Sequence, residues 1–136
     1  MSVVPSQILY LEHGPSRLYA EAIQVMSTRQ LCWSRPTLLI AGLPEDSAAR
    51  RQAAIAEAAQ HPAQSPLELY DLDGAPDLIW PLSPFHLAYD LDFFALLVQL
   101  KMTPDSTKRP SGTTQLNDFI KSFWYSQRDS LPLTQV

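Results

Sequence analysis

Apolar residues alternate with polar ones in several short runs of the chain, and turn-forming residues separate these runs. Alternation with a period of two, or an apolar run short enough for one strand, is typical of β-strands packed on one or both faces. The pattern predicts an antiparallel sheet of about five strands, at residues 8–12, 18–26, 30–41, 67–72 and 77–80. Pro36 predicts a bulge or bend within the third strand. For residues 17–27 a helix stays open as the alternative, because alanine and glutamate favour it.

Two helices are predicted to pack on this sheet. Residues 46–60 are rich in alanine, and Asp46 or Ser47 can cap their first turn. Ser83 can cap a second helix over residues 84–101, whose first residue is a proline. That segment is apolar nearly all round, which predicts a helix that is buried or lies in an interface. The fold class predicted from these elements is therefore α+β.

The last third of the chain has a different composition. Residues 103–113 contain two prolines, one glycine and no large apolar residue, so they predict a flexible linker after a globular domain at residues 1–102. Residues 114–136 form the final segment, in which a helix over about 114–127 carries apolar residues at positions i, i+3, i+4, i+7 and i+8. This apolar stripe consists of Leu116, Phe119, Ile120, Phe123 and Trp124.

Such a short helix is marginal alone in water, so its stripe needs an apolar surface to pack on. One interpretation is that the helix folds back on its own body as the last core helix. The other is docking of the stripe into a groove of a partner protein, with the linker as a tether. The polar linker and the aromatic residues of the stripe favour the second interpretation. Partner docking is the leading hypothesis, with Lys121 and Arg128 as its basic contacts, and both interpretations stay open.

The linker and terminal helix together resemble the targeting segments of bacterial microcompartment cargo and assembly proteins. Residues 104–112 match the linker of such segments, and the five stripe residues match their docking surface. In the body, residues 17–24 and 29–33 look like parts of small cyanobacterial α+β proteins. The resemblance implies a carboxysome assembly factor that contacts a shell protein.

Motifs that could carry chemistry are few. The acidic turn Asp71-Leu72-Asp73-Gly74 begins like a calcium loop, but no glutamate follows at the required distance, so no metal site is predicted. His86 and Asp90 would share one face of the helix over 84–101, which is a general-base arrangement. With Ser83 they define the alternative function, a small-molecule-binding or enzymatic site. The leading hypothesis is a non-catalytic adaptor or assembly factor with no cofactor.

Composition narrows the class of protein further. A chain of 136 residues suits one domain, and its single cysteine, Cys32, rules out a disulfide framework and is expected to be a small buried residue. No apolar run is long enough for a membrane span, and no secretion signal opens the chain. Ten basic residues against fourteen acidic ones argue against nucleic-acid binding. We expect a soluble, cytoplasmic protein, associated with carboxysomes if the resemblance holds. Within the fold, we expect Arg17 and Glu21 to form an ion pair.

Overall fold

The computed structural model describes residues 3–89, 91–102 and 112–130. Its strands are β1 (Ile8–His13), β2 (Ser16–Met26), β3 (Leu31–Ala41), β4 (Glu68–Asp71), β5 (Leu78–Pro81) and β6 (His86–Leu87). Its helices are α1 (Ala48–Gln60), the short 3-10 helix η1 (Pro62–Gln64), α2 (Asp92–Met102) and α3 (Gly112–Ser130). The fold is α+β, as predicted. None of the helices in the described ranges is both long and apolar enough to cross a membrane.

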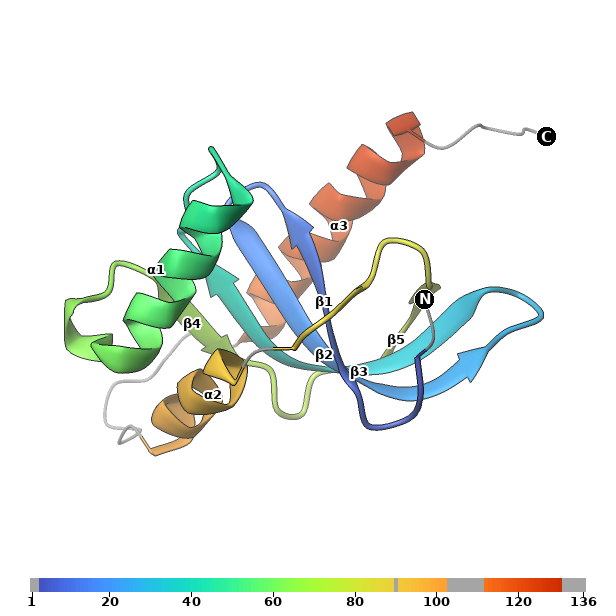
Figure 1. Cartoon of the computed structure of the whole chain (residues 1–136). Coiled ribbons are helices and arrows are strands. Elements are labelled where there is room, and N and C mark those ends of the chain that lie inside the picture. Colours follow the sequence, from blue (N-terminus) through green and yellow to red (C-terminus); the bar gives the residue numbers. More distant parts are fainter. Residues whose placement is uncertain (1–2, 90, 103–111, 131–136) are drawn as a thin grey trace.

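All pairings within the six-stranded sheet are antiparallel. The order along the sheet is β4-β3-β2-β1-β6, and β5 pairs with the other end of β3 (Figure 1). Between β2 and β3 the register shifts, because Tyr19 faces Leu38 whereas Ala20 faces Pro36, which leaves Thr37 outside the pairing. The predicted bulge near Pro36 is thus confirmed. The strand interpretation of residues 17–27 is also confirmed, since β2 runs to Met26.

Helices cover both faces of the sheet, because alternate strand residues point to opposite sides. On one side, Leu9, Leu11, Leu18 and Leu39 pack with buried residues of α3. On the other side, Tyr19, Leu38 and Ile40 pack with buried residues of α1 and α2. The molecule therefore has three layers, with the sheet in the middle, α3 behind it and the α1–α2 layer on the opposite face (Figure 1).

Helix α1 begins where the sequence predicted. Ser47 is its N-cap, and the Ser47 Oγ accepts a hydrogen bond from the Arg50 backbone N–H at 3.1 Å. Ile55 and Ala58 are buried against the sheet, so this alanine-rich helix lies on the core with a thin apolar stripe.

The predicted helix over residues 84–101 is wrong in its first half. Ser83 and Pro84 lie in a turn, with the Phe85 N–H donating to the Leu82 carbonyl at 3.0 Å, and the helix begins only at Asp92. The physical reason is that this segment crosses the edge of the sheet. Phe85 is buried on the α3 side and Phe93 on the α1–α2 side, and β6 pairs with β1 between them.

Candidate functional site

The apolar stripe of the terminal helix packs mainly on its own sheet. Leu116, Phe119 and Phe123 are buried in one cluster with strand residues. The Phe123 ring contacts the Trp80 ring of β5, with centroids 5.9 Å apart, and the His13 ring, with centroids 6.2 Å apart. Of the two interpretations of this helix, packing on its own body is the one that the structure shows for these three residues. For them to dock on a partner, α3 would have to leave the sheet.

The other predicted docking residues lie at the border of this contact or outside it. Ile120 is half-buried, and Lys121 is exposed. Trp124 is 44% exposed and packs edge-on against Trp80, with ring centroids 5.8 Å apart. The side chain of Arg128 lies outside the described residues, as do residues 103–111 of the predicted linker; the last two linker positions, 112 and 113, belong to α3.

The alternative site at Ser83, His86 and Asp90 loses its geometric basis. His86 lies on the two-residue strand β6, and its ring stacks on the Tyr10 ring with centroids 5.1 Å apart. Asp90 lies outside the described residues. The i, i+4 spacing brings two side chains together only on a helix, so the sequence spacing no longer pairs His86 with Asp90.

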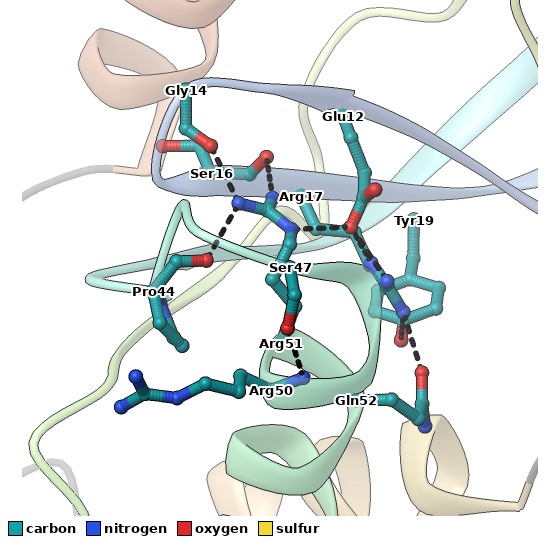
Figure 2. A network of polar contacts seen from close by, with 10 residues as sticks. All are labelled: Glu12, Gly14, Ser16, Arg17, Tyr19, Pro44, Ser47, Arg50, Arg51 and Gln52. Atoms are coloured by element: carbon teal, nitrogen blue, oxygen red, sulfur yellow. Dashed lines mark hydrogen bonds and ion pairs between the residues drawn. The ribbon is translucent and has the colours of Figure 1, made fainter.

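A buried ionic cluster joins α1 to the hairpin of β1 and β2 (Figure 2). One oxygen of Glu12, Oε2, accepts from Arg17 Nε at 2.7 Å and from Arg51 Nε at 3.1 Å. The Arg51 guanidinium also donates to the backbone carbonyls of Gly14, Pro44 and Ser16. Both arginines are almost fully buried. The expected pair of Arg17 with Glu21 is replaced by the cross-strand pair with Glu12, because these two residues face each other in the β1–β2 register.

Arg17 has aromatic neighbours in addition to its carboxylate. Its guanidinium carbon lies 4.0 Å from the centroid of the Tyr10 ring, and Nη1 donates to the Tyr19 hydroxyl at 3.2 Å. Burial alone lowers the pKa of Arg17, but the interactions with Tyr19 and Glu12 outweigh it, so the pKa lies above its ordinary value. Arg17 is thus a permanent cation whose partners are all parts of the fold. We interpret this cluster as structural, since it fastens α1 to the sheet.

The most exposed apolar surface of the described residues lies on α2. Leu91, immediately before the helix, is 75% exposed, and Phe94, Val98 and Met102 are 51%, 54% and 77% exposed. Steps of three or four residues place these four side chains on one side of the helix. We call them the α2 outer face. The opposite side of the same helix is buried through Phe93, Leu96 and Leu100. This explains why the segment is apolar nearly all round: one side completes the core, and the other is left uncovered.

Two open pockets flank the helices. One, of about 460 Å³, lies at the C-terminal end of α2 and is lined by Leu97, Lys101, Asp71, Asp73 and Arg35 among others. The other, of about 340 Å³, lies between the β1–β2 turn and α3. In the first pocket Lys101 binds two acids: its Nζ lies 3.0 Å from Asp71 Oδ2 and 3.6 Å from Asp73 Oδ2. Among the described residues, no three side chains of His, Cys, Asp or Glu are grouped to hold a metal ion.

The α2 outer face could be foreseen only in part. The all-round apolar composition indicated a helix that is buried or lies in an interface, but which side stays exposed depends on how the chain crosses the sheet. Glu12 and Arg51 were missed because they are 39 residues apart, and no spacing along the chain relates them.

Comparison with known proteins found no matching family, no curated relative and no similar solved structure. What the chain binds therefore has to be inferred from its own contacts, burial and charges.

Proposed function

We propose that this protein is a non-catalytic adaptor or assembly factor that binds a partner protein through the α2 outer face. The observation that carries the proposal is the row of four large, exposed apolar side chains along that helix. Single exposed apolar residues are ordinary on protein surfaces, whereas a continuous exposed patch is typical of an interaction site. The sequence predicted docking through the terminal helix α3, whereas this proposal assigns it to α2, on the other side of the sheet.

The energy available from this face suits a reversible interaction. Complete burial of a large apolar side chain stabilises by about 2 kcal/mol, so covering the exposed parts of these four side chains supplies on the order of 5 kcal/mol. Association itself costs roughly 4–15 kcal/mol in lost freedom of motion. The face is therefore the centre of an interface that needs further contacts around it. Tyr89, which is 84% exposed and just precedes Leu91, is well placed to supply one.

The resemblance of residues 104–124 to microcompartment targeting segments makes a shell protein the first partner to assay. Residues of α3 that are exposed, Lys121 and Trp124, are available as a second contact without unpacking the helix. They lie on the other side of the sheet from α2, so a partner that uses both surfaces has to be large or to have several copies.

The proposal is tested by capture with the tagged full chain from its native host, followed by titration with the purified partner. The test variant is Phe94→Gln/Val98→Gln. The matched control is Ile79→Gln, which removes an equally exposed apolar side chain on β5. We expect the double variant to bind the purified partner at least about tenfold more weakly in calorimetry, with the control unchanged. Equal affinity of the double variant and the wild type would contradict the proposal.

A further inference from the structure

The α2 outer face has the shape of a docking surface for another helix. From Leu91 to Met102 it extends over about three helical turns, or about 16 Å at about 1.5 Å per residue. The row contains no charged side chain. A straight apolar row of this length matches the apolar stripe of a second amphipathic helix, which packs by the same three- and four-residue ridges.

The borders of this face are acidic. Asp92 lies in the first turn of α2. At the other end, Lys101 is shared by Asp71 and Asp73, so this group has a net charge of −1. Arg35, on the same pocket, is paired with Asp77.

Residues 45–60, which contain the neighbouring helix α1 and the turn before it, have three acids and two bases, a net charge of −1. The exposed base, Arg50, pairs with Asp46, with Nη1 and Oδ2 2.6 Å apart. The exposed Glu57 remains as an additional acid. Within the described parts of the α1–α2 layer, each exposed lysine or arginine thus has an acidic partner, and the acids are in excess.

This charge distribution selects among the possible occupants. A second copy of the chain, docked on the same face, would set one layer with an excess of acids, among them the net negative group of Asp71, Asp73 and Lys101, against another layer of the same charge. Like charges in these positions oppose association, whereas opposite charges around an apolar centre favour it and speed it up. The face therefore suits a partner with a basic border.

We infer that the partner presents an amphipathic helix whose apolar stripe is bordered by lysine or arginine. This inference rests on the proposed function and adds the chemistry of the partner. The acids that would receive these bases are Asp73, at the C-terminal end of α2, and the exposed Glu57 of α1.

The test uses three labelled peptides of about 15 residues, long enough for three to four helical turns. All have leucine at the same positions i, i+3, i+4 and i+7, and lysine, glutamine or glutamate at the border positions. Binding to the full chain is measured by fluorescence anisotropy at about 50 mM and about 300 mM salt, because screening weakens contacts between exposed charges. The protein variants are Phe94→Gln/Val98→Gln, Asp73→Asn and the control Ile79→Gln.

We expect the lysine peptide to bind about tenfold more tightly than the glutamate peptide, since each rim charge contributes a factor of a few. This difference in affinity should shrink at high salt. Asp73→Asn should weaken binding of the lysine peptide a few-fold, and Phe94→Gln/Val98→Gln should weaken binding of all three peptides. Ile79→Gln should change none of them.

Other outcomes overturn the inference. If the three peptides bind equally through Phe94 and Val98, the basic border is wrong and the proposed function stands. If no peptide binds, or if ultracentrifugation shows a dimer that the double variant dissociates, the predicted occupant is wrong. The proposed function itself fails in a separate way, when the purified native partner does not distinguish the double variant from the wild type.

Discussion

Helices α3 and α2 attach to opposite faces of one sheet, and they use their apolar residues differently. Helix α3 has a single apolar stripe, and Leu116, Phe119 and Phe123 in it are buried on the sheet. Helix α2 has apolar residues on two sides, of which one is buried and the other exposed. An apolar stripe on one side of a helix indicates only that this side needs an apolar surface to pack on, and the protein's own sheet can provide it. Apolar residues in excess of what the fold can bury are a better indication of a binding surface.

The largest expected effect on stability comes from comparing a phenylalanine-to-alanine substitution in α3 with one in α2. Phe123→Ala removes a buried ring that packs on Phe119 and Trp80, so we expect a loss of about 3–5 kcal/mol in the free energy of unfolding. Phe94→Ala removes a half-exposed ring and should cost less than about 1 kcal/mol. Urea denaturation of the full chain measures both. Equal losses would mean that the two helices do not differ in the way described.

A smaller loss is expected from the ionic cluster that holds the α1–α2 layer. Glu12→Gln leaves Arg17 and Arg51 buried without their carboxylate. Loss of one partner of a fully buried pair costs about 3–5 kcal/mol, and because Glu12 is partly exposed we expect about 2 kcal/mol.

The matched control for the ionic cluster is Asp46→Asn. It breaks the exposed pair with Arg50 and should change stability by less than about 0.5 kcal/mol. Similar urea midpoints for the two variants would show that the cluster is not what fastens α1.

The smallest effect concerns β5, which carries the Trp80 ring against α3. Hydrogen bonds from the Trp33 indole at 2.9 Å and from Arg35 at 3.2 Å lower the pKa of Asp77 below its ordinary value. A lowered folded-state pKa contributes stability above the unfolded-state pKa of about 4, and this contribution is lost as the pH falls through the folded-state value. Asp77→Asn should therefore reduce the acid-side slope of stability below about pH 4. An unchanged slope in urea titrations at several pH values would contradict it.

The parts of this molecule differ in how well the sequence predicts them. Strands β1 to β5 and the start of α1 follow from alternation and from capping by Ser47, which are local properties. Residues 84–89 are wrongly predicted as helix because an all-round apolar run has no periodic phase, and because pairing of β6 with β1 is a long-range contact. The periodicity correctly predicts which residues of α3 form its apolar stripe, but it does not indicate which surface the stripe packs on.

Hydrogen exchange of the full chain, with and without its purified partner, tests the central claim most directly. We predict that binding protects the amides of residues 91–102 and does not speed exchange in residues 112–130, because the stripe of α3 stays packed on the sheet. Protection confined to residues 112–130, or faster exchange there as the helix leaves the sheet, would contradict the account and return the binding role to the terminal helix.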